Sequence, residues 1–408
     1  MAREYKDVVV GLDIGTAKVM AVVAEVLPNG ELKLAGLGVA PSNGLKRGVV
    51  VNIDATVQSI QQALKEAELM ADCKIQRVYT GITGSHIRGQ NSRGMVAIKD
   101  KEVTATDVAR VVETAKAISI SSDQRLLLVE PQEFIIDGQE VKEPIGMSGI
   151  RLEANIHIVT GAQSAAENII KCVRRCGLEV EQLLLNPLAS SQAVLTDDER
   201  ELGVACVDIG AGTTDVAIFT GGSIRHTAVI PIAGDQITND IAMALRTPTR
   251  EAEDIKCKFG CALSELADPE DVLDVAGVDD RPSRRLSRRA LADVIQPRVE
   301  ELFELVQAEL RRSGFDQVLS SGIVLTGGSS VMPGMIELGE EVFHMPVRLG
   351  IPKYTGALAD VVQHPRFATA CGLLLEAQTQ RKRGLKVREK RDVKQVFGRM
   401  KSWFEKNF

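Results

Sequence analysis

Two stretches of the chain share one pattern of apolar and polar positions. Residues 11–23 read GLDIGTAKVMAVV and residues 207–219 read VDIGAGTTDVAIF. In each, an apolar run ends in an aspartate, continues through Ile-Gly and small or hydroxyl residues, and resumes as a second apolar run. This order predicts two β-hairpins with tight glycine turns. Because similar units within one chain indicate duplication, we expect a molecule built from two related halves.

The apolar periodicity between the hairpins predicts alternating strands and helices. Strands are expected at 8–26, 32–39, 77–82 and 180–185, and helices at 55–71, 165–176 and 186–195. Pro187 suits the first turn of the last helix, whose small residues would let two backbones approach closely. Residues 197–201 (DDERE) are interpreted as a charged linker. The second half of the chain is expected to begin just after them.

A change of composition marks residues 84–160 as an inserted subdomain. The segment opens with glycine-rich and hydroxyl-rich pieces, GSHIRGQNSRG, to which we assign no regular element. A helix is expected near 106–117, with strands near 126–136 and 152–159.

Helices dominate the prediction beyond the second hairpin. They are expected at 232–245, 250–260, 291–312 and 366–378, and one strand is expected to end in Gly327-Gly328. Glu253 and Lys256 fall at i,i+3 on one helix face, either as a solvated ion pair or as part of a nucleotide pocket. The basic run 281–289 (RPSRRLSRR) is a solvated face on its own and also suits an acidic or extended partner segment.

The glycine turns carry the candidate chemistry. The second turn combines two glycines with two threonines, Gly210, Gly212, Thr213 and Thr214. Glycine permits backbone angles that a Cβ forbids, so that successive N–H groups can converge on phosphate oxygens while hydroxyls add donors. Asp13 and Asp208 precede their turns, where a carboxylate can hold Mg²⁺ through water. Two such loops facing each other would clamp one nucleotide; the alternative is a pair of ordinary glycine hairpins.

Composition narrows the class of protein. Apolar residues make up 44% of the 408 positions and supply an ample core. Seven cysteines without a CxxC pair favour a reducing compartment over a disulfide framework or a zinc site. The first apolar run, 8–12, is too short for a signal peptide, and no run is long enough to span a bilayer. We therefore expect a cytoplasmic protein.

The charge is concentrated at the C-terminal end. Residues 381–408 hold eleven Lys/Arg and three Asp/Glu, although the whole chain has a net charge of −6. On a helical wheel the large apolar side chains of 393–408 share one face, namely Val393, Val396, Phe397, Met400, Trp403, Phe404 and Phe408. This pattern predicts an interfacial membrane helix on anionic lipid, joined to the body by the basic linker 381–392. The alternatives are a helix docked on the body or in a partner groove.

Five motifs, taken in chain order, resemble the signature of the actin, sugar kinase and heat-shock chaperone ATPase superfamily. They are DIGT (13–16), NPLASSQAVL (186–195), DIGAGTTD (208–215), LTGGSSVMPG (325–334) and HPRFATACGLLL (364–375). The stretch 198–242 is similar, more specifically, to the bacterial cell-division FtsA family.

The resemblance implies an α/β, actin-like (ribonuclease H-like) fold of two halves with an inserted small subdomain and a C-terminal amphipathic helix. The first core subdomain would comprise 1–83 and 161–199 with a closing helix at 354–380, and 84–160 would be the insert. The second core subdomain would comprise 200–233 and 313–353, with 234–312 as its small subdomain.

The resemblance also implies ATP and Mg²⁺ as cofactors. It assigns to the nucleotide the residues Asp13, Gly15, Thr16, Lys18, Asp208, Gly210, Gly212, Thr213, Thr214, Asp235, Glu253, Lys256, Gly327 and Gly328, with Asp13 and Asp208 at the metal. Ala211 departs from the superfamily, which often has a third glycine there, and a methyl fits only if that position needs no positive φ. Gln163 and Asp215 are the candidates for activating water, so at most a slow ATPase is expected.

As function, the resemblance implies a protein that polymerises on the cytoplasmic face of the bacterial inner membrane at the division septum. It would tether FtsZ filaments there and meet other division proteins. The FtsZ C-terminal peptide is expected on 234–312, near Arg284, Arg285 and Arg288. The alternatives are a phosphotransfer kinase, for which no acceptor pocket or base is evident, and a rod-shape or pilus actin homologue. No nucleic-acid partner is expected.

Overall fold

The two apolar hairpins lie at the centre of two separate five-stranded sheets. The computed structural model of the protein describes residues 7–277, 283–354, 356 and 358–381. The first sheet contains, in spatial order, β11 (Glu179–Leu185), β6 (Arg77–Ile82), β1 (Val8–Ile14), β2 (Lys18–Val26) and β3 (Leu32–Pro41). The second contains β18 (Val347–Leu349), β17 (Ile323–Thr326), β12 (Val204–Ile209), β13 (Thr214–Thr220) and β14 (Ser223–Ile230).

The two sheets have the same topology. Strand β1 pairs antiparallel with β2 and parallel with β6, just as β12 pairs antiparallel with β13 and parallel with β17. Almost every residue of β1 and β12 is buried, because both faces of each sheet are covered. The predicted α/β fold of two related halves is confirmed at the level of strand order.

The helices of the first half follow the predicted periodicity. Helix α1 (Ile53–Ala71) begins where the Asn52 side chain accepts a hydrogen bond from the Ala55 N–H at 3.0 Å. Its buried face packs on the sheet beside α3 (Gln163–Arg175), and together they form one apolar core. The opposite face of the sheet is covered by a helix over residues 368–381.

Two helices cross between the halves with their backbones in close contact. They are α4 (Asn186–Val194) and the helix over 368–381. A Cβ at Gly372 would overlap the carbonyl oxygen of Ala189, and one at Gly11 would lie 2.7 Å from the Ala370 carbonyl oxygen. The predicted close approach at the small residues of α4 is therefore confirmed.

The inserted subdomain has its own sheet and its own core. In spatial order its strands are β7 (Arg88–Ala97), β10 (Arg151–Ala162), β8 (Gln124–Ile136) and β9 (Gln139–Val141), and α2 (Ala105–Ala115) packs on them. Strand β7 was not predicted, because its polar and glycine residues show no apolar alternation. It is held by a ten-residue ladder with β10.

The second half contains two regular elements that were not predicted, because their segments show mainly charged residues. The predicted linker at 197–201 is wrong, since Asp197–Leu202 forms α5 with a capping box between Thr196 and Glu199. The basic run 281–289 is also more ordered than predicted. Arg284–Ser287 forms β16, which pairs with β15 (Val272–Val275), and α8 begins at Arg288.

The remaining elements of the described chain complete the second half and the connections. The larger helices are α6 (Gly234–Leu245), α7 (Thr249–Phe259), α8 (Arg288–Ser313) and α9 (Met335–Phe343). The short elements are β4 (Leu45–Lys46), β5 (Val49–Val50), α10 (Ala359–Val362), η1 (Ser264–Leu266), η2 (Asp316–Val318) and η3 (Pro365–Phe367).

Among the described residues, no helix is both long and apolar enough to cross a bilayer. The predicted amphipathic helix at 393–408, with its seven apolar side chains, lies outside the described residues, as does the basic linker beyond residue 381.

Candidate functional site

A cavity of about 520 Å³ is lined by both hairpin turns, and this volume is typical of small-ligand sites. Its walls come from both turns, from α7, from the loop after β17 and from the start of the helix over 368–381. Most of the predicted site residues line it: Asp13, Gly15, Thr16, Lys18, Asp208, Gly210, Gly212, Thr213, Asp215, Glu253, Lys256, Gly327 and Gly328.

The two turns close in the same way. The Gly15 N–H donates to the Lys18 carbonyl at 3.0 Å, and the Gly210 N–H donates to the Thr213 carbonyl at 3.0 Å. The two turns are therefore built alike, as two copies of one unit would be.

Close approach, rather than unusual backbone angles, explains the glycines of the second turn. Neither Gly210 nor Gly212 has a positive φ, so this part of the prediction is wrong. A Cβ on Gly212 would instead lie 2.5 Å from Thr16 Oγ1 and 2.9 Å from the Arg47 Cα. Ala211 also lacks a positive φ, so its methyl group fits without backbone strain.

Three buried carboxylates gather beneath the turns. Burial, together with the charge of Asp208, raises the pKa of Asp13 to about 7. Burial raises the pKa of Asp208 to about 6, although Thr369 Oγ1 donates to its Oδ2 at 3.1 Å. Burial and Asp208 also raise the pKa of Asp215 well above its ordinary value, and Thr83 Oγ1 donates to Asp215 Oδ1. Such a group of carboxylates favours a bound cation.

Mg²⁺ fits these carboxylates only if it also brings further oxygen ligands, such as those of a bound phosphate. Within the described residues, no cluster of three or more His, Cys, Asp or Glu side chains is arranged to hold a metal. Mg²⁺ commonly takes one or two carboxylates and fills its remaining positions with water and phosphate oxygens. Asp13 and Asp208 match that pattern for an ion that arrives with a phosphorylated ligand.

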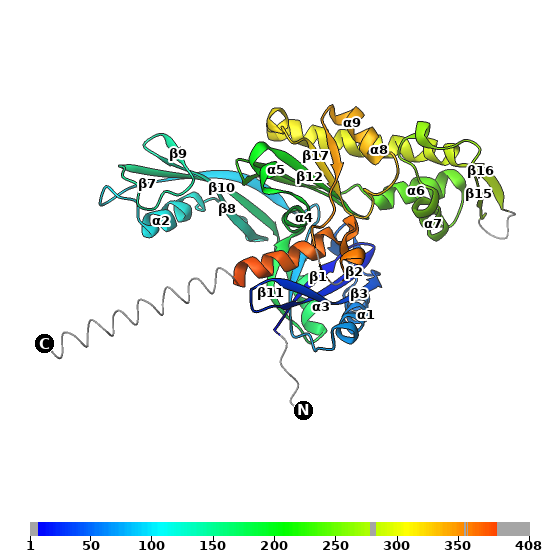
Figure 1. Ribbon diagram of the computed structural model, residues 1–408, viewed down its shortest axis with the longest axis horizontal. Helices are drawn as coiled ribbons and strands as arrows, with labels where there is room; N and C mark the ends of the chain where they lie inside the picture. The colour runs from blue at the N-terminus through cyan, green and yellow to red at the C-terminus, as the bar shows by residue number, and fades with distance from the viewer. Residues whose placement is uncertain (1–6, 278–282, 355, 357, 382–408) are drawn as a thin grey trace.

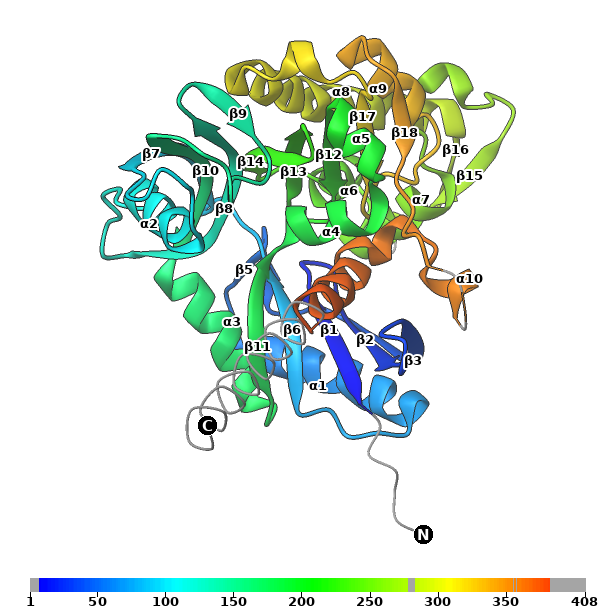
Figure 2. The same cartoon turned by 60° about the vertical axis from the view of Figure 1, so that its left-hand side comes forward.

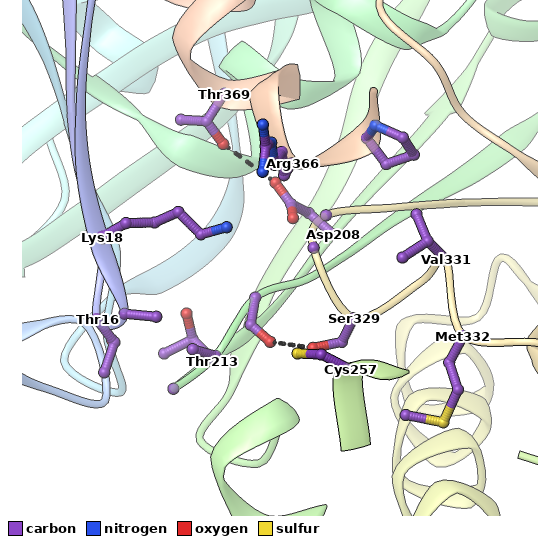
Figure 3. A pocket seen from close by; sticks show the side chains of 18 of the residues that line it. Thr16, Lys18, Asp208, Thr213, Cys257, Ser329, Val331, Met332, Arg366 and Thr369 are labelled. Atoms are coloured by element: carbon purple, nitrogen blue, oxygen red, sulfur yellow. Dashed lines mark hydrogen bonds between the residues drawn. The ribbon is translucent and has the colours of Figure 1, made fainter. Parts of the chain in front are cut away.

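Positive charge enters the cavity from β2 and from the segment just before the helix over 368–381. The Lys18 side chain extends toward Asp208 and Arg366 in Figure 3, and burial and Arg366 lower its pKa. The Arg366 guanidinium lies 4.7 Å from the ring centroid of Phe367. Two cations without a dominant acidic partner make this end of the cavity suitable for an anion.

The opposite wall is organised by Lys256. Its Nζ donates to Glu253 Oε2 at 2.6 Å, to Thr238 Oγ1 at 2.8 Å and to the Gly234 carbonyl at 3.1 Å. Lys256 is buried, and both members of the pair line the cavity. Glu253 and Lys256 therefore lie in the wall of the cavity and do not form a solvated surface pair.

The loop after β17 is fastened to the second turn. Gly327 has a φ of +88°, and a Cβ there would overlap Asp208 Oδ1. Ser329 Oγ donates to the Gly210 carbonyl at 2.8 Å. Gly328 faces the cavity, where only Arg366 Cβ lies within 4 Å of the position that its own Cβ would take. The space next to Gly328 is therefore open, which leaves room for a planar ring.

Three of the predicted residues do not line the cavity. Gln163 begins α3, and its amide donates to Glu167 Oε1 at 2.6 Å. Thr214 is fully buried and donates to the Ile232 carbonyl at 2.7 Å. Asp235 lies at the start of α6, where its backbone N–H donates to the Ala211 carbonyl at 2.8 Å.

Other residues that line the cavity were not among the predicted site residues, and those with a polar side chain include Thr83, Asn186, Ser329, Arg366 and Thr369. Four of these five lie inside or beside motifs that had been recognised, so their motif positions were a usable signal. Thr83 follows β6, and nothing in its local sequence points to a ligand.

Duplicated sheets with facing glycine turns, each preceded by a buried aspartate, define an actin-like protein. Solved structures support this class. The chain matches the PilM-PilN type IV pilus biogenesis complex with a TM-score of 0.66 at 20% identity, covering 90% of this chain and 98% of that one. It matches MreB 5 of Spiroplasma citri bound to AMPPNP with a TM-score of 0.59 at 15% identity, covering 94% and 99%. At these identities the likeness concerns the fold alone.

Sequence relatives narrow the class to one family. The chain is 55% identical to cell division protein FtsA of Pseudomonas aeruginosa, over 98% of each chain. It is 46% identical to that of Escherichia coli, over 99% of each. Family models for cell division protein FtsA and for the SHS2 domain inserted in FtsA match residues 205–372 and 84–160. The chain belongs to the FtsA family of cell division proteins.

Proposed function

We propose that this FtsA-family protein binds ATP with Mg²⁺ between its two hairpin turns and assembles on the inner membrane, where it holds FtsZ filaments. The observation that carries the nucleotide proposal is the contact between the two turns at Gly212 and Thr16, above three buried carboxylates. A further support is the fold shared with MreB 5 structures that contain ADP and AMPPNP.

Each wall of the cavity has a part in this proposal. Backbone N–H groups of both turns, with Thr16, Thr213 and Lys18, bind the phosphates. The bound Mg²⁺ supplies positive charge against the phosphate oxygens, and Asp13 and Asp208 hold its water ligands. Glu253 and Lys256 face the ribose, and Gly328 lies flat against the base.

We expect the protein to hydrolyse ATP slowly. Asp215 is the carboxylate best placed to accept a proton from an attacking water, and the hydroxyl of Thr83 orients it. Burial and the charge of Asp208 raise the pKa of Asp215 well above its ordinary value. Its Oδ1 already accepts a hydrogen bond from the Thr83 hydroxyl, which leaves less of the carboxylate free to act as a base. We therefore expect slow turnover. Gln163 has no part in this proposal, because it does not line the cavity.

Nucleotide binding is tested by thermal and chemical unfolding of the full chain with Mg-ATP. A ligand at about 100 times its Kd adds about 2.7 kcal/mol to the free energy of unfolding. We expect that increase with Mg-ATP and a much smaller one with ATP in EDTA. An unfolding curve that Mg-ATP does not shift would contradict the proposal.

The membrane part rests on the sequence of 381–408 and on where the described chain leads to it. Arg381 Nη1 donates to both carboxylate oxygens of Asp7 at 2.8 Å, which fixes this end of the helix to the first half. Truncation after residue 392 should release the protein from vesicles of anionic phospholipid and leave the Mg-ATP stabilisation intact. Persistent vesicle binding of the truncated chain would contradict the anchor.

The FtsZ peptide is assigned to the small subdomain 234–312. Two of the three predicted arginines have internal partners, since Arg284 donates to the Leu245 carbonyl and Arg288 Nε to the Phe259 carbonyl at 3.0 Å. Both carbonyls lie at helix C-termini, so these two side chains cap α6 and α7. Arg285 is exposed.

A groove between α6 and α8 offers an additional contact surface on this subdomain. It is lined by Asp240, Met243, Ala244, Val294, Pro297, Arg298 and Glu301. Met243 is 77% exposed and lies in this groove with the ion pair of Arg298 and Asp240, so that the groove offers an apolar contact beside charged ones. We expect Met243→Glu to abolish binding of a fluorescent FtsZ C-terminal peptide. If replacement of Arg284, Arg285 and Arg288 by Glu leaves the affinity for this peptide unchanged, the arginine patch is excluded.

Self-assembly is the remaining part of the proposal. The chain shares its fold with the MamK double helical filament, at a TM-score of 0.53 over 91% of this chain. One amphipathic helix is a weak anchor, and a filament would hold many of them at high effective concentration. Pelleting of the full chain on anionic vesicles should therefore rise steeply, rather than linearly, with protein concentration.

A further inference from the structure

The inserted subdomain contacts both halves of the molecule at once. Its covalent connections, near residues 84 and 160, join it to the first half, yet β7, β8 and β10 also lie against β14 of the second half. The ends of β8 and β10 lie beside α3 of the first half. The insert therefore contacts both of the halves that enclose the candidate nucleotide cavity.

A register shift in the β8–β10 ladder directs Gln132 into the second half. Asn155 pairs with Glu133 and Ile156 pairs with Pro131, so Gln132 is the extra residue. Extra residues of this kind re-aim a side chain. The Gln132 side-chain amide donates to the Ile224 carbonyl of β14 at 2.8 Å, and the residue is buried.

A polar cluster, in which His157 and Thr227 are buried, reinforces this contact. Asn91 Nδ2 donates to the Arg225 carbonyl at 3.1 Å, which leaves Asn91 Oδ1 to accept from His157 Nδ1 at 2.6 Å. His157 Nε2 then accepts from the Thr227 hydroxyl of β14 at 2.9 Å. A Cβ on Gly89 would lie 2.6 Å from Thr227 Oγ1, so glycine allows β7 to approach β14.

A second register shift in the same ladder directs Leu127 into the first half. Val159 pairs with Leu128 and Thr160 pairs with Leu126, which makes Leu127 the extra residue. Leu127 packs against the apolar core of the first half. A Cβ on Gly161 would lie 2.7 Å from Leu127 Cδ1, so glycine again makes room for the contact.

From these two contacts we propose that the insert is a strap that sets the spacing of the two halves, with Gln132 as its attachment to the second half and Leu127 as its attachment to the first. Four residues lie between the two attachment points along one strand, so a change in the angle between the halves must strain or shift β8. The strap positions the walls of the nucleotide cavity without touching the nucleotide.

The proposal deepens the proposed nucleotide function and rests on it only for its second test. The first test uses hydrogen exchange of the nucleotide-free full chain. Gln132→Glu keeps the side-chain size but turns a donor into an acceptor that faces two carbonyl oxygens, Ile224 and Arg225. Exchange at 223–230 should become about tenfold faster, while Gln90→Glu, at an exposed position of β7, should have no effect. Unchanged exchange at 223–230 in Gln132→Glu overturns the strap.

The second test adds Mg-ATP. In the wild-type chain, exchange should slow at 127–133 and 223–230, although none of these residues lines the cavity. In Gln132→Ala, which is the milder variant, that remote slowing should disappear, and the Mg-ATP Kd should rise about fivefold, at the low end of measured couplings between sites. Remote slowing that persists in both Gln132 variants overturns the proposal. A wild-type chain that takes up no Mg-ATP refutes the proposed function, and the nucleotide-free test still decides the strap.

Discussion

The two hairpin turns have one backbone plan and opposite chemistry. The first turn ends in Lys18, where the second has Thr213, and Asp13 pairs across its hairpin with Met20, where Asp208 pairs with Asp215. The first turn thus contributes a cation, and the second contributes a hydroxyl and an additional carboxylate. The two turns therefore share one backbone plan but differ in charge, although each is preceded by a buried aspartate.

The turns also differ in how closely they are packed. The position that corresponds to Gly212 in the first turn is Ala17, whose side chain is exposed. At this position only the second turn is therefore restricted to glycine, because Gly212 is pressed against Thr16 and Arg47. The contact between the turns is asymmetric although their folds are not.

The largest expected effect comes from a substitution at Gly212, where the two turns touch. Gly212→Val should weaken Mg-ATP binding about 100-fold, which equals about 2.7 kcal/mol, because the new side chain pushes the turns apart. Ala17→Gly is the matched control and should change the Kd less than threefold. Titration with a fluorescent ATP analogue measures both. Equal effects of the two substitutions would contradict the account.

The second prediction concerns pH. With folded-state pKa values of about 7 for Asp13 and about 6 for Asp208, the folded chain binds more protons than the unfolded chain between pH 4 and 7. The free energy of unfolding without nucleotide should therefore fall as pH rises, by up to about 1.4 kcal/mol per pH unit for each proton. Mg-ATP binding should tighten about tenfold over pH 6 to 7.5, because Mg²⁺ needs ionised carboxylates.

Asp13→Asn sharpens this prediction by removing one titrating carboxylate and leaving Asp208 and Asp215. The fall of the free energy of unfolding with rising pH should then be smaller than in the wild type, as followed by urea unfolding at several pH values. A profile identical to that of the wild type would contradict the raised pKa of Asp13 in the nucleotide-free protein.

The third prediction concerns the carboxylate that only the second hairpin has. Thr83→Val removes the hydroxyl that donates to Asp215 and should lower the free energy of unfolding by about 1–2 kcal/mol. The loss should be larger at pH 8 than at pH 5, because the hydroxyl stabilises the ionised form. Thr83→Ser keeps the donor and should retain most of the stability. A loss of equal size for Val and Ser would assign the effect to packing.

The smallest effect is expected at Ala211. Because this residue has no positive φ, Ala211→Gly should change the Mg-ATP Kd less than twofold and lower stability by less than about 1 kcal/mol. A gain of affinity above tenfold would mean that the methyl group hinders the ligand.

The sequence predicted the frame well because apolar periodicity and glycine turns are local signals. Both hairpins, α1 and α4 lie where the pattern placed them. Strand β7 was missed because its stability comes from pairing with β10 and not from its own composition. Helix α5 was also not predicted, although the sequence contains its capping box, Thr196 and Glu199. The run of charged residues there was interpreted as a linker instead.

The candidate site was predictable where motif and contact coincide. Asp13, Asp208 and Lys256 belong to recognised motifs, and all three line the cavity. Thr83 reaches the cavity only because the ends of β6 and β13 meet across the halves, which no local pattern encodes. The roles of Gln132 and Leu127 depend on register shifts, which a single sequence does not reveal.

The most direct test of the account is the affinity of the full chain for a fluorescent ATP analogue, with Mg²⁺ and with EDTA, in the wild type and in Gly212→Val. The account predicts saturable one-to-one binding that weakens at least tenfold without Mg²⁺ and about 100-fold in the variant. Binding that is indifferent to both changes, or no saturable binding, would show that the two turns do not enclose a nucleotide.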